Sequence, residues 1–214
     1  MSAGSSIAVG ITGHRPNRLL VGAGRVAERL RVALTAIKRG IRSGPRQIAK
    51  LVAISPMAEG SDRLFAEAAL SLGFEVDALL PMPGKDYETT FSDTHQLAVY
   101  RNLLSRSASI TELPGTLDES TAAYEAVGQT IADRSQILIA VWDGKPAAGR
   151  GGTPEIIAYA ISIGRPVIWI DAARHRSPLL LRGSNTGRDV PLATLAKRAE
   201  ALTGANIAAL AGRL

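Results

Sequence analysis

The sequence predicts a doubly wound α/β fold with a mostly parallel sheet. Strand-like and helix-like segments alternate over residues 6–170, and the strand-like segments are apolar on both faces, as in sheets that helices cover on both sides. Apolar residues make up 46% of the 214 residues but aromatic residues only 4%, so alanine, isoleucine, leucine and valine supply the layers. We expect one Rossmann-like domain over residues 1–170, with an appendage over residues 171–214.

The N-terminal part contains three predicted strands with helices between them. SIAVGI (6–11) is the first strand, and apolar residues at helical spacing indicate a helix over 24–39. KLVAIS (50–55) is the second strand, and a striped helix follows over 61–73. FEVDALLP (74–81) completes the third strand, so the start of the chain is built from two complete βα units.

A loop follows the third strand. We expect MPGKDYETTFSD (82–93) to be flexible, with Lys85, Asp86 and Tyr87 able to close over a ligand. A helix over 97–106 and a short strand over 107–113 come next.

The remaining units repeat the alternation before it breaks down. A helix over 121–132 leads into the strand QILIAVW (136–142), and a second helix ending at residue 163 leads into the strand PVIWI (166–170). We expect an irregular basic loop over 171–190 and then one amphipathic helix, which uses Leu192, Leu195, Ala199 and Leu202. That helix could dock on the sheet, form a dimer contact or lead into a further domain.

The charge balance predicts an anionic partner. The formal net charge is +6, which suits a nucleotide, a nucleic acid or an acidic surface, although solubility is the simpler explanation. The arginines are scattered along the chain, and aromatic residues do not interleave with them as in many nucleic-acid binders.

The composition also limits the cofactor and the compartment. The chain has no cysteine and three histidines, which excludes disulfides and thiolate sites, so we expect no metal and no cofactor. No segment offers the roughly 18–20 uninterrupted apolar residues of a membrane span, and the N-terminus has no signal-peptide pattern. We expect a cytoplasmic protein with no membrane segment.

The loops that follow strands are where a ligand is expected. In an open α/β sheet, ligands bind beyond the carboxyl ends of the strands, in a crevice left by the crossovers. Three such loops combine glycine with a hydroxyl or a positive side chain: ITGHRP (11–16), SPMAEGSDR (55–63) and WDGKPAAGRGGTPE (142–155).

The glycine-rich loop GRGGTPE predicts a phosphate cradle. Thr153 suits the N-cap of the next helix and Pro154 its first position, while Gly149, Gly151 and Gly152 leave backbone N–H groups open to close approach. A helix N-terminus carries roughly half a positive charge and attracts anions. The alternative is a capped loop without a ligand.

The loop AEGSDR repeats this arrangement. Gly60 precedes Ser61, which we expect to cap the helix, and Asp62 stands in the first turn, where a carboxylate is favourable. Capping explains much of the pattern, but Asp62 could also bind a ribose hydroxyl and Arg63 could reach a phosphate.

Further candidates come from the first and fifth strands. Gly13, His14 and Arg15 leave the sheet near its centre, where a histidine beside an arginine suits an anion. Asp143 ends the fifth strand and could orient a sugar or cap its own loop. Glu155 could bind ribose or act as a general base, although an acidic residue in a first turn also has a structural reason.

Other polar residues have simpler interpretations. His95 and Tyr124 are expected to be partly buried helix residues, and His175 to be solvated.

Taken in order, these motifs resemble the SLOG superfamily, which joins the LOG phosphoribohydrolases, the DprA recombination mediators and ligand-sensing domains of bacterial defence systems. The resemblance spans 7–170 and rests on GITGHR, AEGSDRLFAEAA and ILIAVWDG followed by GRGGTPE. It implies a nucleotide or nucleotide-derived ligand held by Gly151, Gly152 and Thr153. In the hydrolytic LOG enzymes a glutamate stands three places after the threonine, whereas Glu155 stands two places after Thr153, a rotation of about 100° on a helix.

Three functions follow from these observations. The first is a nucleotide sensor or regulatory domain, the second is hydrolysis of the N-glycosidic bond of a nucleoside monophosphate with Glu155 as its catalytic group, and the third is single-stranded DNA binding as in DprA proteins. We favour the sensor, and we expect a homo-oligomer or an effector that is fused or separate.

Overall fold

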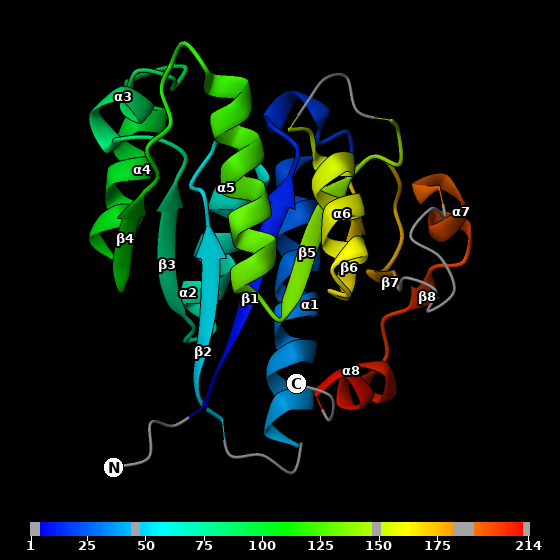
Figure 1. Cartoon of the computed structure of the whole chain (residues 1–214). Coiled ribbons are helices and arrows are strands. Elements are labelled where there is room, and N and C mark those ends of the chain that lie inside the picture. Colours follow the sequence, from blue (N-terminus) through cyan, green and yellow to red (C-terminus); the bar gives the residue numbers. More distant parts are fainter. Residues whose placement is uncertain (1–4, 44–47, 147–150, 182–190, 212–214) are drawn as a thin grey trace.

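The structure is a computed structural model that describes residues 5–43, 48–146, 151–181 and 191–211, and it confirms the predicted doubly wound fold (Figure 1). One sheet of eight strands has the order β4-β3-β2-β1-β5-β6-β7-β8. Neighbours from β4 to β6 pair in parallel, and β7 and β8 join antiparallel at the edge. The strands are β1 (Ser5–Gly13), β2 (Ile48–Ser55), β3 (Glu75–Leu80), β4 (Ser109–Glu112), β5 (Ile137–Trp142), β6 (Val167–Asp171), β7 (Leu179–Leu181) and β8 (Glu200–Ala201).

Helices cover both faces of this sheet, α1 and α2 one face and α5 and α6 the other (Figure 1). Because the strands lie between these layers, every residue of β5 and β6 is buried. The helices are α1 (Ala23–Arg42), α2 (Ser61–Ser71), α3 (Gly84–Glu88), α4 (Thr94–Ser105), α5 (Ser120–Arg134), α6 (Thr153–Ser162), α7 (Leu192–Lys197) and α8 (Gly204–Ala211), with a 3₁₀ turn η1 at Pro16–Arg18.

Helix α1 shows how the apolar periodicity positions a layer. Val26, Leu30, Leu34 and Ile37 are fully buried against the sheet, while the opposite side of the helix carries arginines. Burial of each large aliphatic side chain contributes about 1.5–3 kcal/mol, so this stripe alone anchors the helix.

The segment after β3 differs from the expected flexible loop. Residues 84–88 form α3, and Tyr87 is completely buried because its ring packs edge-on against Phe91 and Tyr100, with centroid distances of 5.1 and 5.8 Å. A helix this short has too few turns to show a period in sequence. The expectation for His95 is also wrong, since this side chain is exposed on α4.

The C-terminal part also differs from the expected basic loop and single helix. The leucines of β7 pair with β6, so the sheet continues past residue 170, and α7 ends at Lys197 before β8. Helix α8 packs on α1, with Gly40 facing Ile207. Three consecutive leucines in the sequence indicate the strand β7, but the basic residues around them favour a loop. His175 is exposed, as predicted.

The strand order creates the feature that positions the site. From β1 the chain proceeds to β2 on one side, while β5 pairs with β1 on the other side. The carboxyl ends of β1 and β5 are therefore a topological switch point, where crossovers depart in opposite directions and leave a crevice. Within the described ranges, no helix has the length and apolar character needed to cross a membrane.

Candidate functional site

A cavity of about 440 Å³ opens at the carboxyl ends of β1 and β5, and its size lies in the range of small-molecule sites. The loop after β1, the N-terminus of α2, the residues before α6, one face of α5 and Tyr87 of α3 line it. The three loops that the sequence singles out therefore lie at one place. Gly149, part of the predicted cradle, lies outside the described residues.

His14 is held at this cavity by Asp143. The imidazole Nε2 lies 3.0 Å from Asp143 Oδ1, and Arg18 Nη2 donates to Asp143 Oδ2 at 2.7 Å. Burial opposes ionisation of Asp143, but the hydrogen bonds from Arg18 and His14 prevail and lower the pKa of this carboxyl to about 2. Asp143 is therefore ionised, and it positions His14 and Arg18 without itself lining the cavity.

His14 is in turn linked to Thr153. Burial lowers the pKa of the imidazole, although the hydrogen bond to Asp143 works in the opposite direction, so the ring is neutral near pH 7. His14 Nε2 also lies 3.2 Å from the Asp143 backbone N–H, and Nδ1 lies 3.4 Å from Thr153 Oγ1, so the tautomer determines which of these contacts the ring accepts. Hydroxyl, imidazole and carboxylate thus form a row that joins the loop after β1 to the start of α6.

The N-terminus of α6 begins one residue earlier than predicted. Gly152, not Thr153, is the N-cap, with extended backbone angles, so Thr153 and Pro154 occupy the first two helical positions. Gly151 has a positive φ of 74° that favours glycine. The described residues offer no acceptor to the backbone N–H groups of Gly152 and Thr153, and both residues line the cavity. These donors make the start of α6 suitable for an anion.

Glu155 does not line the cavity. Its Oε2 accepts a hydrogen bond from the Gly151 N–H at 2.5 Å, and the side chain is exposed. The carboxylate therefore caps its own loop, which is the structural reason for an acidic residue in a first turn.

Gly60 and Ser61 hold the loop after β1 in place. Gly60 is the N-cap of α2, where Ser61 was expected, because the Ser61 hydroxyl instead donates to the His14 carbonyl at 2.8 Å. A Cβ on Gly13 would lie 2.6 Å from Ser61 Cβ, so only glycine allows this approach. Gly13 lines the cavity, while Gly60 and Ser61 lie behind it.

Arg63 is not brought to the cavity either. Its guanidinium donates to the backbone carbonyls of Met57 and Gln96 at 3.1 and 2.7 Å, and lies 4.4 Å from the centre of the Phe91 ring. These contacts tie α2 to α4, so the predicted contact with a phosphate has no geometric basis for Arg63.

Asp62 and Tyr87 present polar atoms without partners. Both line the cavity, and Asp62 is 6% exposed and Tyr87 0% exposed. Within the described chain, Asp62 Oδ1 and the Tyr87 hydroxyl make no hydrogen bond. Burial raises the pKa of Asp62 to about 7, against the opposing effects of Arg15, the Ala58 N–H and Arg63.

Helix α5 supplies an apolar wall that sequence reasoning did not assign to the site. Its contributing residues follow the i, i+3, i+4 and i+7 pattern of one helix face: Thr121, Tyr124, Val127, Gly128 and Ile131. The Arg15 guanidinium lies 5.6 Å from the centre of the Tyr124 ring, within cation–π distance. The period was visible in sequence, but a face that packs on a core and a face that lines a cavity have the same pattern. Tyr124 is half-buried, as predicted.

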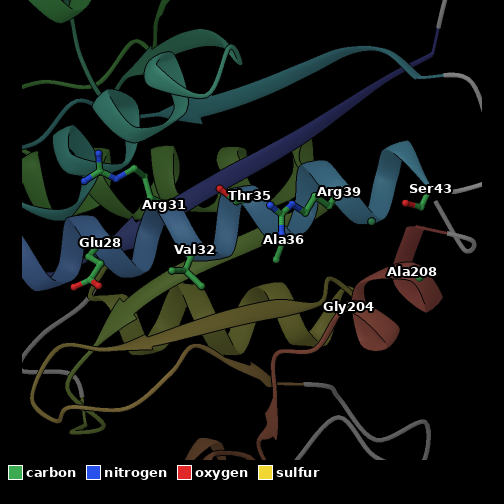
Figure 2. Close-up of a pocket in the computed structure, with 10 residues that line it drawn as sticks. Glu28, Arg31, Val32, Thr35, Ala36, Arg39, Ser43, Gly204 and Ala208 are labelled. Atoms are coloured by element: carbon green, nitrogen blue, oxygen red, sulfur yellow. The ribbon is translucent and has the colours of Figure 1, made fainter.

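A larger hollow, of about 620 Å³, lies between α1 and α8 (Figure 2). Its lining includes Val32, Thr35 and Arg39 of α1, and none of the predicted site residues. Most of the predicted site residues therefore line the smaller cavity, whereas Gly60 and Arg63 line a third hollow of about 540 Å³.

Comparison with known proteins gives the fold. No family model matches the chain, and no curated protein matches its sequence. Among solved structures, DNA processing protein A (DprA) from Streptococcus pneumoniae aligns with a TM-score of 0.53 and 16% identity, covering 95% of this chain. The chain has the Rossmann-like fold of DprA.

That alignment covers 61% of the DprA chain, so this chain spans less than two thirds of DprA. A structural-genomics structure of the protein TM1055 aligns with a TM-score of 0.44 and 14% identity, covering 75% of this chain and 72% of the other. The alignment with DprA confirms the predicted Rossmann-like fold.

Proposed function

We propose that this chain binds a nucleotide or a nucleotide-derived ligand in the cavity at the carboxyl ends of β1 and β5, and serves as a sensor or regulatory domain. One observation carries the proposal: Gly152 and Thr153, whose N–H groups have no acceptor among the described residues, line one cavity together with Arg15 and the apolar face of α5. An anion site beside an apolar wall suits a molecule with a phosphate at one end and a flat base at the other.

The phosphate would lie at the start of α6. The helix N-terminus there provides two donors and roughly half a positive charge. Arg15 adds a full charge from the loop after β1, while the Asp143 charge is compensated by Arg18. The base would lie against α5, where the half-buried Tyr124 offers a ring face.

Thermal denaturation and calorimetric titration against a panel of mononucleotides, cyclic nucleotides and ADP-ribose test the proposal. A ligand at one hundred times its Kd stabilises the folded chain by about 2.7 kcal/mol. Arg15→Gln should weaken binding of the active panel member roughly tenfold, because one charge-assisted contact is lost. Arg134→Gln is the matched control, since Arg134 is exposed at the far end of α5.

Two results would count against the proposal. Either no panel member binds, or Arg134→Gln weakens binding as much as Arg15→Gln does. The second result would mean that net charge and not the cavity determines affinity.

Single-stranded DNA binding, suggested by the name of DprA and by the net charge of +6, is less well supported. Such sites stack bases on accessible aromatic rings. All nine aromatic side chains of this sequence lie in the described ranges, and each of them is buried or half-buried. The ring of Tyr124 can stack with one base, but a strand needs a series of exposed rings. If the protein retained oligonucleotides in a salt-sensitive manner, single-stranded DNA binding would become the preferred function.

A further inference from the structure

Asp62 and Tyr87 line the same cavity, and neither is among the proposed phosphate contacts. Asp62 comes from the first turn of α2 and Tyr87 from α3, so two elements each contribute a residue with a buried polar atom to the lining of one cavity. Native proteins seldom leave such groups unpaired, because each costs about 1–3 kcal/mol. A ligand that provides the missing hydrogen bonds would remove this cost.

The chemistry of Asp62 and Tyr87 limits which chemical groups of a ligand can bind to both side chains. A second anion would face the Asp62 carboxyl, and a cation would face the positive charge of Arg15, which acts on both groups. Within the described ranges, no three metal-ligating side chains cluster. A hydroxyl suits both partners, because it donates to a carboxylate oxygen and accepts from a phenol.

We propose that Asp62 and Tyr87 form a subsite for two neighbouring hydroxyls of a sugar, so that the ligand is built on a ribose phosphate and not on a 2-deoxyribose phosphate. The inference rests on the proposed function, since the phosphate is taken to lie at the start of α6. One sugar hydroxyl donates to Asp62 Oδ1, and the Tyr87 hydroxyl donates to the oxygen of the other.

Both side chains are fixed before any ligand arrives. The Tyr87 ring is packed against Phe91 and Tyr100, and Asp62 is held on a helix whose N-cap is Gly60. A preorganised pair loses little conformational entropy on binding, so removal of one sugar hydroxyl should leave a buried group unpaired and reduce affinity.

The test compares ribose 5-phosphate with 2-deoxyribose 5-phosphate, which makes it independent of the base. Affinities are measured by NMR titration of the labelled full chain, with inorganic phosphate as a third probe. We expect ribose 5-phosphate to bind roughly tenfold more tightly than its deoxy analogue. Tyr87→Phe and Asp62→Asn should each reduce that ratio several-fold, while leaving the affinity for inorganic phosphate within about twofold.

Tyr100→Phe is the matched control. In the part of the chain that the structure describes, the Tyr100 hydroxyl is also buried without a partner. Tyr100 does not line the cavity, so this variant should keep the ribose preference. Thermal unfolding of each variant verifies that it is folded.

Equal affinity for the two sugar phosphates would overturn the subsite and leave the proposed function standing. The same conclusion follows if Tyr100→Phe reduces the ratio as much as Tyr87→Phe does. If none of the three phosphate probes binds, the proposed function fails first, and the subsite fails with it.

Discussion

Two buried aspartates beside one cavity differ in protonation because their partners differ. Asp143 receives hydrogen bonds from a guanidinium and an imidazole, and its pKa falls to about 2. Asp62 has an oxygen that finds no hydrogen-bond partner among the described residues, and burial raises its pKa to about 7. A buried carboxyl is thus ionised or neutral according to the donors that its neighbours supply.

The raised pKa of Asp62 predicts a pH-dependent stability. A carboxyl whose folded pKa lies above its unfolded value of 3.8 contributes stability that is complete below the unfolded pKa and is lost as the pH rises through the folded pKa. Asp62→Asn removes this loss. The free energy of unfolding of the variant, relative to that of the wild type, should therefore rise between about pH 4 and pH 8 by on the order of 4 kcal/mol. The charged groups that act on Asp62 are Arg15 and Arg63.

Urea unfolding of both proteins across this pH range checks the prediction. A difference in unfolding free energy that stays constant with pH would show that Asp62 is ionised in the folded protein at every pH tested.

At the scale of elements, loops that follow different strands are joined by side chains. Asp143 links the end of β5 to His14 and Arg18 after β1, and Thr153 extends the link to α6. Loops from three crossovers therefore form the cavity, and its shape depends on the side-chain contacts that join these loops.

Asp143→Asn should destabilise the protein by about 1–3 kcal/mol near pH 7, because Arg18 and the buried His14 lose a charged acceptor. Urea unfolding measures the change. Asp133→Asn is the control, since Asp133 is exposed and its carboxylate accepts a hydrogen bond from the Tyr159 hydroxyl of α6. An equal loss of stability in both variants would contradict the special role of Asp143.

The elements were predictable from sequence to different degrees. Periodicity predicted α1, α2 and α5, because long stripes of buried aliphatic residues are a local property. The N-caps predicted for α2 and α6 each lie one residue too late. Ser61 and Thr153 have side chains typical of N-caps, but in the folded protein their hydroxyls contact His14. Tertiary contacts likewise bury Arg63 away from the cavity and bring Tyr87 into it, and no local pattern encodes such contacts.

At the scale of the whole molecule, the strand order determines which loops meet. A single sequence indicates which loops follow strands, but the positions of β1 and β5 at the centre follow from long-range pairing. Once that order is known, the switch point brings the loops after β1, β2 and β5 around one cavity. The chain that follows β6 extends the same sheet at its edge, away from this point (Figure 1).

Amide chemical shifts recorded while a nucleotide of the panel is added test the central claim most directly. We predict that the largest changes occur at Gly152 and Thr153, with further changes at Arg15 and Tyr124. Changes confined to Val32 and Thr35, which line the hollow between α1 and α8, or no changes at all, would contradict binding at the switch point.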